Sequence, residues 1–237
     1  MTTATFESSK RRTFELLEIN KGSRLLDVGC GTGEDVRAMA SLVGNTGGVT
    51  GIDHSEAMVT EARKRTNSEV LPIEYQQCDA HQLYFSDDTF DGCRAYHVLM
   101  HLEEIVRVTK PGGRVVLCEP DLETWIIDSP YRSVTRKILN FRCDGFRNGW
   151  IGRQLPALFQ DCGLVETAIE PVTIIWTDYA WTNQRFGFQA IAERAQEAGV
   201  VSSTEVKTWI ASLQEAGRSG SFFAAFTMFI VSGRKHQ

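Results

Sequence analysis

The chain has 237 residues, of which 42% are hydrophobic, so it is long enough to bury a full core, and one large domain is the simplest prediction. Its formal net charge of −5 offers no basic surface to a polyanion and argues against nucleic acid as a partner. The six cysteines are dispersed and include no Cys-x-x-Cys pair, which predicts reduced thiols. The sequence shows no signal peptide and no apolar run of membrane length, so we expect a cytoplasmic protein without membrane contact.

A glycine-rich loop follows the first predicted helix and strand. The helix is expected over residues 8–19, and a short apolar run over 24–28 reads as a buried parallel strand. Glycines then occupy alternate positions from Gly29 to Gly33, and a second helix begins at Glu34. Glycine can take positive φ and bring the backbone close to a ligand, and a helix start offers unpaired N–H groups. This pattern is typical of a nucleotide-binding loop.

The residues around the loop indicate which nucleotide it binds. The third glycine of a dinucleotide loop would stand where this chain has Glu34. Glu34 and Asp35 place two carboxylates at the helix start, where they would repel a pyrophosphate but suit a ligand with ammonium and sulfonium groups. Compensation of the helix dipole explains the same two residues, and that alternative stays open. Asp27, near the end of the strand, can anchor the loop or accept a hydrogen bond from an amino group.

The next helix and strand continue the alternation. Apolar residues at i, i+3, i+4 and i+7 over positions 36–43 predict a helix that packs on the sheet. A strand over 49–52 ends in Asp53, twenty positions after Gly33. An acidic side chain there can accept hydrogen bonds from both hydroxyls of a ribose. The alternative is a helix N-cap, a function that Ser55 already supplies.

The run Asp27-Val28-Gly29-Cys30-Gly31-Thr32-Gly33 resembles the first motif of the class I S-adenosylmethionine-dependent methyltransferases, and the resemblance covers roughly residues 16–117. It implies S-adenosylmethionine as the cofactor. It also implies an α/β fold, a doubly wound Rossmann-like sheet of seven mainly parallel strands with an antiparallel final strand and a helical lid insertion. The cofactor-binding residues expected on this resemblance are Asp27, Gly29, Cys30, Gly31, Asp53, His54, Met58, Asp79, Ala80 and Arg94.

The resemblance gives some of these residues separate roles. Asp53 is expected to bind the ribose. Asp79 is expected to accept the adenine amino group, with the backbone of Ala80 beside the ring, although a turn or cap role for Asp79 stays open. Met58 is expected against the adenine, whereas a methionine on a helix is otherwise typical of a core.

The segment after the fourth strand distinguishes classes of acceptor. Residues 96–102 lack the Asn/Asp-Pro-Pro-aromatic motif of enzymes that act on DNA bases or peptide amides. They resemble the Val-Leu-x-His-Leu motif of small-molecule and quinone or natural-product methyltransferases, which implies a small aromatic or apolar acceptor. His101 is the predicted catalytic base and His97 a second candidate, since both titrate near neutrality. Without acidic partners they predict no metal site. The connection from Leu102 to the next helix is shorter than in the family, which leaves the placement of His101 open.

Two later stretches are expected to cover the acceptor. Residues 120–163 interleave aromatic residues with arginines, which favours an aromatic-lined acceptor pocket. An ordinary helical cover with buried aromatics and solvated arginines explains the same composition. Residues 178–218 form the second covering segment, and both are expected inside one methyltransferase domain over 1–237. Further strands are expected over 73–77, 92–95, 114–119, 165–176 and 221–232, and late helices over 181–198 and 204–217.

The predicted function is transfer of a methyl group from S-adenosylmethionine to a small organic acceptor. The reaction is an in-line displacement, which proximity and exclusion of water promote. Two alternatives stay open: a catalytically silent S-adenosylmethionine-binding protein, and an NAD-dependent oxidoreductase, against which Asp27 and Glu34 argue. The sequence predicts neither the identity of the acceptor, nor whether oxygen, nitrogen or carbon is methylated, nor the oligomeric state.

Overall fold

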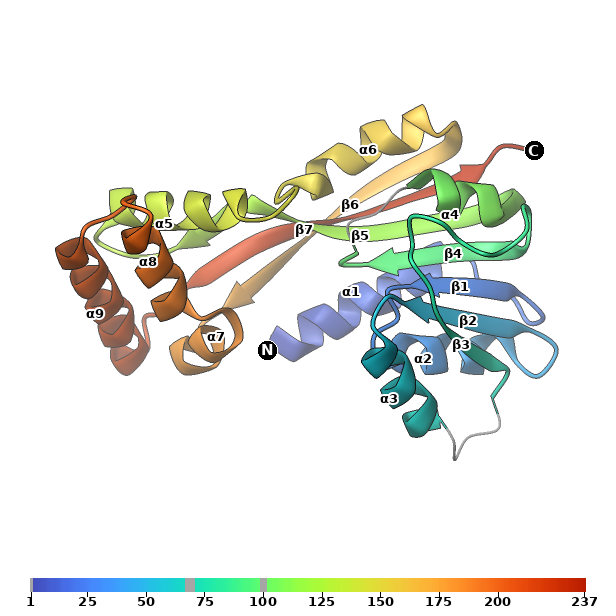
Figure 1. The fold of residues 1–237 in the computed structure, drawn as a ribbon, viewed down its shortest axis with the longest axis horizontal. Coiled ribbons are helices and arrows are strands. Elements are labelled where there is room, and N and C mark those ends of the chain that lie inside the picture. Colours follow the sequence, from blue (N-terminus) through green and yellow to red (C-terminus); the bar gives the residue numbers. More distant parts are fainter. Residues whose placement is uncertain (1, 67–70, 99–101) are drawn as a thin grey trace. The chain divides into compact units, whose positions relative to one another are not determined.

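The computed structural model describes residues 2–66, 71–98 and 102–237 (Figure 1). The strands in these ranges are β1 Arg24–Val28, β2 Gly48–Asp53, β3 Ile73–Gln77, β4 Phe90–Tyr96, β5 Thr109–Ile127, β6 Leu164–Trp176 and β7 Ala224–Lys235. The helices are α1 Thr2–Leu16, α2 Glu34–Val43, α3 Glu56–Thr66, α4 Leu102–Val108, α5 Arg132–Asp144, α6 Ile151–Asp161, α7 Tyr179–Phe186, α8 Phe188–Glu197 and α9 Ser203–Ser219.

Within the described ranges the strands form one seven-stranded sheet in the order β3-β2-β1-β4-β5-β7-β6. β1 pairs in parallel with β2 and β4, β2 with β3, and β4 with β5. Figure 1 shows that β7 runs opposite to its neighbours β5 and β6. The predicted fold class, a mainly parallel Rossmann-like sheet with an antiparallel final strand, is therefore confirmed.

The strand and helix on either side of the glycine loop have the predicted bounds. The last four residues of β1 are buried, as expected for a strand between two others. α2 buries Val36, Met39, Ala40 and Val43, the four positions of its apolar stripe, and it packs on β1, β2 and β3. The strong 3.6-residue period thus fixes which side of α2 faces the sheet.

The fifth strand is longer than the sequence predicts. It was expected over 114–119, but β5 runs from Thr109 to Ile127 and continues through Pro120. The run Lys110-Pro111-Gly112-Gly113, a sequence typical of a turn, interrupts the pairing with β4: Phe90 pairs with Thr109 and Gly92 with Arg114, while Gly112 has φ 76°. The sheet pairing therefore absorbs a turn sequence that would end an isolated strand.

Two helix predictions need correction. The first helix was expected over 8–19, but α1 ends at Leu16, because the chain turns at Glu18 with φ 52°. The helix expected over 181–198 is two helices, α7 and α8, separated by Gly187 in the left-handed region at φ 67°. The side chain of Asn183 accepts a hydrogen bond from the N–H of Phe188 at 3.0 Å, which satisfies one orphan donor at the break.

The chain divides into two compact units, to each of which β5, β6 and β7 contribute. The glycine-loop unit consists of Glu7–Glu119, Gly152–Glu170 and Phe229–Gln237. The aromatic unit consists mainly of Pro120–Ile151 and Pro171–Met228, where α5, α7, α8 and α9 pack together. The prediction of one domain over 1–237, with covering segments at 120–163 and 178–218, stays a prediction.

Burial decides between the two interpretations for some aromatic residues of the segment 120–163. Trp125 and Phe159 are buried as core residues, whereas Tyr131 and Phe146 are exposed. All six cysteines are free in the structure, and five of them are buried. Across the described part of the chain, no helix combines the length and the apolar character needed to cross a membrane.

Candidate functional site

A cavity of about 840 Å³ lies in the glycine-loop unit, where β1, β2, β3 and β4 reach their carboxyl ends. Parallel strands open their ligand sites at this edge of a sheet. Five of the predicted cofactor residues line this larger cavity: Gly29, Asp53, His54, Asp79 and Ala80. The sequence therefore brings residues from three separate connections to one place.

A smaller cavity of about 220 Å³ lies beside the loop itself. It shares the lining residues Gly29 and Tyr96 with the larger cavity, so the two adjoin. The predicted cofactor residues that line it are Asp27, Gly29, Cys30, Gly31 and Arg94. The backbone at Gly29 thus belongs to the wall of both cavities.

The glycines of the loop differ in what surrounds them. Gly29, Gly31 and Gly33 all have positive φ, between 53° and 75°. A Cβ atom at Gly29 would overlap Val98, and one at Gly33 would overlap the ring of Tyr75. A Cβ at Gly31 would meet no described protein atom within 4 Å. Two glycines are therefore needed for packing, while Gly31 leaves open space into which a ligand can approach the backbone.

Asp53 links the second strand to the loop. Its carboxylate accepts a hydrogen bond from the N–H of Gly31 at 3.0 Å and another from the N–H of Ser55 at 2.9 Å. Ser55 in turn accepts from the N–H of Met58 at 3.4 Å, so the serine has the capping role that was expected of it. Asp53 is buried, yet it lines the larger cavity, and each carboxylate oxygen keeps a lone pair for a ligand hydroxyl.

Asp27 is paired with an arginine of the neighbouring strand. Asp27 and Arg94 occupy partner positions in the β1–β4 register, and the guanidinium lies 2.7 Å from the carboxylate. Arg94 also donates to Asp35 at 2.9 Å and to the hydroxyl of Thr13 at 2.7 Å. Burial raises the pKa of Asp27 to about 6, although the charge of Arg94 opposes that rise. Arg94 therefore acts on the site by orienting the carboxylates of Asp27 and Asp35.

The acidic helix start is neutralised by cations of the protein. Lys10 of α1 lies 2.9 Å from Glu34 and 3.1 Å from Asp35, and Arg94 holds the other oxygen of Asp35. Burial lowers the pKa of Lys10, but the two carboxylates outweigh burial and raise it. Both residues of the acidic pair thus have protein partners in addition to the helix dipole. Sequence analysis did not find Lys10, because it lies in a different helix with no pattern that links it to the loop.

The acidic residue after β3 is more exposed than Asp53. The side chain of Asp79 is 69% exposed, and its carboxylate accepts from the N–H of His81 at 2.9 Å. This hydrogen bond and the contact with the His81 ring lower the pKa of Asp79. A hydrogen bond from the N–H of His81 to the side chain of Asp79, two residues earlier, is typical of a turn, the alternative role that the sequence analysis leaves open for Asp79. His54, with a side chain 90% exposed, stands beside it on the cavity rim.

Two predicted site residues are not among the described residues that line either cavity. Met58 lies on α3 and is exposed, and neither lining includes it. His101, the predicted catalytic base, lies outside the described residues. Its role stays a prediction.

The backbone after β4 is held beside the larger cavity. His97 has φ 58°, unusual for a residue other than glycine, and its N–H donates to the carbonyl of Cys118 at 2.9 Å. Its ring stacks on Tyr96 with the centroids 4.6 Å apart. The N–H of Val98 donates to the carboxyl of Glu119 at 2.6 Å. Burial raises the pKa of Glu119 to about 8, so this group is mostly neutral at pH 7.

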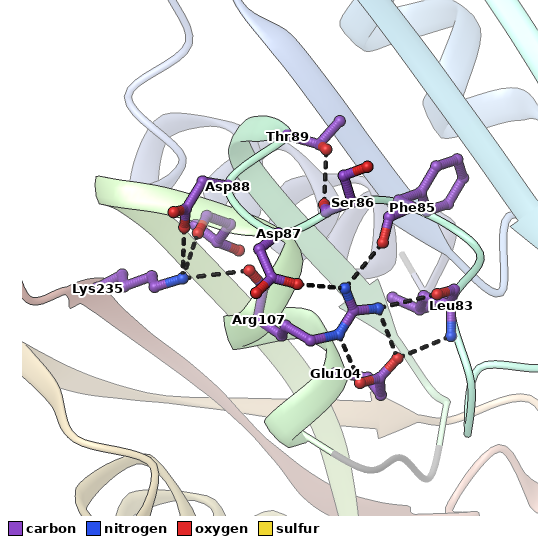
Figure 2. A network of polar contacts seen from close by, with 10 residues as sticks. Leu83, Phe85, Ser86, Asp87, Asp88, Thr89, Glu104, Arg107 and Lys235 are labelled. Carbon is purple, nitrogen blue, oxygen red and sulfur yellow. Dashed lines mark hydrogen bonds and ion pairs between the residues drawn. The ribbon is translucent and has the colours of Figure 1, made fainter.

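A polar network fixes the segment between β3 and β4 (Figure 2). Arg107 of α4 donates to the backbone carbonyls of Leu83 and Phe85, each at 2.8 Å. Glu104 accepts from Arg107 at 2.8 Å and from the N–H of Leu83 at 2.9 Å, and these bonds lower its pKa to about 2. Tyr84 lies inside this segment and lines the larger cavity. The network therefore determines where that wall of the cavity stands.

The chemistry of the site follows from these donors and acceptors. Among the residues that the structure describes, no group of three or more His, Cys, Asp or Glu side chains is arranged to hold a metal ion. The cavities offer carboxylates at Asp27, Asp53 and Asp79, and open backbone at Gly31. Such a site suits a ligand with a ribose, an amino group and no phosphate. The fold and site thus define a Rossmann-like, nucleoside-binding protein.

Comparisons with known proteins identify the family. Residues 26–117 match the family model described as a methyltransferase domain. An uncharacterized 37.1 kDa protein in transposon TN4556 of Streptomyces fradiae is 37% identical over 239 residues, which cover 97% of this chain and 68% of that protein. The demethylmenaquinone methyltransferase of Bacillus cereus (strain AH187) is 35% identical over 125 residues, 49% of this chain and 53% of that enzyme. The YcgJ protein from Bacillus subtilis has a TM-score of 0.66 at 19% identity, covering 98% and 99% of the two chains.

The chain belongs to the class I S-adenosylmethionine-dependent methyltransferases. It is therefore a methyltransferase, and its cofactor is S-adenosylmethionine. The chain spans about half the length of the demethylmenaquinone methyltransferase that it matches.

Proposed function

We propose that this protein transfers the methyl group of S-adenosylmethionine to a small aromatic or apolar acceptor. One observation carries the proposal: two adjoining cavities meet at Gly29, with open space at Gly31 and the carboxylate of Asp53 at the wall. The name of the Bacillus cereus relative, a demethylmenaquinone methyltransferase, supports an acceptor of this kind. We retain a cytoplasmic location, and no contact with nucleic acid or membrane, as predictions.

The proposed binding roles follow the lining of the cavities. Asp53 accepts the ribose hydroxyls while its bonds to Gly31 and Ser55 hold the loop in place. Asp79 accepts the adenine amino group, with the backbone of Ala80 and the ring of His54 beside it. At the other end, Asp27 accepts the amino group of the methionine part. Gly29, Cys30 and Gly31 provide the backbone surface between the two ends, and Arg94 positions Asp27.

The protein's contribution to the reaction is positioning. S-adenosylmethionine, when bound, supplies a methyl group on a sulfonium that an acceptor takes by in-line displacement. The loop and Asp53 fix where that methyl group points, and the walls at Tyr84 and His97 limit the access of water. Orientation of this kind lowers the activation barrier by up to roughly 7–11 kcal/mol. For an acceptor that must lose a proton, the proposed base is His101, with His97 at the cavity wall as the second candidate.

Calorimetric titration with S-adenosylmethionine, S-adenosylhomocysteine and NAD tests the proposal. The matched variants are Asp53→Asn, which removes the cavity carboxylate but keeps one acceptor for Gly31, and Asp161→Asn, which neutralises an exposed aspartate on α6. We expect the first two ligands to bind, about tenfold or more weakly in Asp53→Asn, and unchanged in Asp161→Asn. Binding of NAD alone would support the oxidoreductase alternative. Cofactor binding without turnover of any phenolic or quinone-like compound would support the silent binding protein.

A further inference from the structure

A group of arginines and aromatic rings in the aromatic unit has no role in the proposed binding of the cofactor. Arg142 stands in the last turn of α5, Arg185 at the end of α7 and Arg194 on α8. The charged groups that act on Arg142 are Arg194 and Arg185, both cations. Burial, and then these two charges, lower the pKa of Arg142 to about 10. The fold thus assembles three positive charges where their repulsion costs stability.

Aromatic rings surround the central guanidinium. Its carbon atom lies 5.0 Å from the ring centre of Trp125, 5.8 Å from that of Phe146 and 6.0 Å from that of Phe186. Arg185 lies 5.5 Å from the ring of Phe186 as well. Rings of this kind stabilise a cation only in part and offer it no hydrogen-bond acceptor. Phe146, which is exposed, does offer a flat apolar surface beside the charge.

Hydrogen-bond donors around Phe186 lack acceptors. In the described part of the chain, the buried Nε of Arg142 has no partner, and one Nη atom donates to the carbonyl of Phe186 at a long 3.4 Å. The indole N–H groups of Trp125 and Trp176 are likewise buried without an acceptor. Both indoles lie against Phe186, with ring centres 4.9 and 5.0 Å away. Arginine and tryptophan side chains can only donate. The two indoles are enclosed in the core, whereas Arg142 is only partly buried, so its Nε can take an acceptor from outside the chain.

We infer that Arg142 and Arg185 form a binding site for an organic anion, a carboxylate or phosphate carried on an aromatic body. The anion supplies the acceptor that the Nε of Arg142 lacks, and arginine binds planar oxyanions with paired hydrogen bonds. The ring of Phe146 receives the aromatic body of the ligand. Phe146 is 43% exposed, so its ring is accessible from solvent.

Calorimetric titration of the full chain tests this inference with simple probes. The anionic probes are 1-naphthoate and 1-naphthyl phosphate, which distinguish the two oxyanions. 1-Naphthylmethanol carries the ring without charge, while acetate and inorganic phosphate carry charge without the ring. The variants are Arg142→Gln and Arg185→Gln, and the matched control is Arg132→Gln, an exposed residue at the start of the same helix. No cofactor is added, so the result is independent of the proposed methyl transfer.

We expect one or both aromatic anions to bind and to raise the melting temperature. Affinity should fall about tenfold or more in Arg142→Gln and severalfold in Arg185→Gln, and it should be unchanged in Arg132→Gln. The neutral alcohol and the ring-free anions should bind far more weakly. Because Arg185 is exposed, its variant keeps the test decisive even where Arg142→Gln does not fold. Equal binding of the neutral alcohol, unchanged affinity in Arg185→Gln, or no binding of either aromatic anion at millimolar concentration would overturn the inference.

Discussion

The carboxyl group of Glu119 should make the protein less stable at alkaline pH, and Glu119→Gln should remove that dependence. The side chain is 2% exposed, and burial raises its pKa to about 8 from an ordinary 4.5. The folded-state pKa lies above the unfolded one, so the folded state binds the proton more tightly. The stabilising contribution of the neutral form is therefore complete below about pH 4.5 and is lost as the pH rises through about 8.

The size of the effect follows from the two pKa values. At 1.36 kcal/mol per pH unit, the interval from 4.5 to about 8 corresponds to roughly 5 kcal/mol, as an upper bound, of unfolding free energy. Glutamine has nearly the same planar shape as the protonated glutamate and keeps an oxygen that can accept from the N–H of Val98, which lies 2.6 Å from the glutamate oxygen. The substitution thus removes the ionisation and keeps the hydrogen bond.

Urea unfolding followed by circular dichroism, repeated at intervals between about pH 5 and pH 9, measures this difference. Wild type should lose stability relative to Glu119→Gln as the pH rises, and the difference should level off above the folded-state pKa. Glu7→Gln, at an exposed glutamate of the same unit, is the control and should follow wild type. Parallel profiles for wild type and Glu119→Gln would show that the carboxyl group is not buried as described, and would refute the reasoning.

Two further substitutions test the region around the loop. Arg94→Met should lower the free energy of unfolding by about 3–5 kcal/mol, because it leaves Asp27 buried without its cation. Arg94→Lys cannot hold both carboxylates in the same way, so its free energy of unfolding should lie between those of wild type and Arg94→Met. Urea unfolding measures both differences. An Arg94→Met variant as stable as wild type would contradict the described pairing. Gly31→Ala should cost about 1–2 kcal/mol, because φ is 53°, but should weaken S-adenosylmethionine binding by about tenfold or more, because the methyl group enters the open space. Unchanged affinity in calorimetry would place the cofactor elsewhere.

Local patterns explain why the glycine-loop unit was predictable. Alternating glycines, a five-residue apolar run and a clean helical stripe set β1 and α2 at their predicted bounds. The resemblance to the methyltransferase family implied that Asp53 and Asp79 belong to one site, and both line the larger cavity, where the carboxyl ends of parallel strands meet. The bounds of the elements thus came from spacing within a few residues, and the site residues came from the resemblance.

Contacts between segments distant in the chain could not be predicted from the sequence. Arg94 was expected at the site, but its pairing with Asp27 depends on the register of two strands. Lys10 reaches the loop from a separate helix, and the burial of Glu119 depends on packing that no local pattern records. The break at Gly187 was missed because a single glycine inside a helical pattern does not by itself end a helix, and only its φ of 67° marks the end of α7. Sequence patterns thus predicted elements better than the partners of buried charges.

The two ends of the site should respond differently to ionic strength. At the smaller cavity, Lys10 pairs with Glu34, whose side chain is 76% exposed, and salt screens such a pair strongly. At the larger cavity, Arg107 bonds the neutral carbonyls of Leu83 and Phe85, and these contacts change little when mobile ions are added. Concentrated salt should therefore loosen the loop that faces the methionine part while the wall beside Tyr84 stays in place.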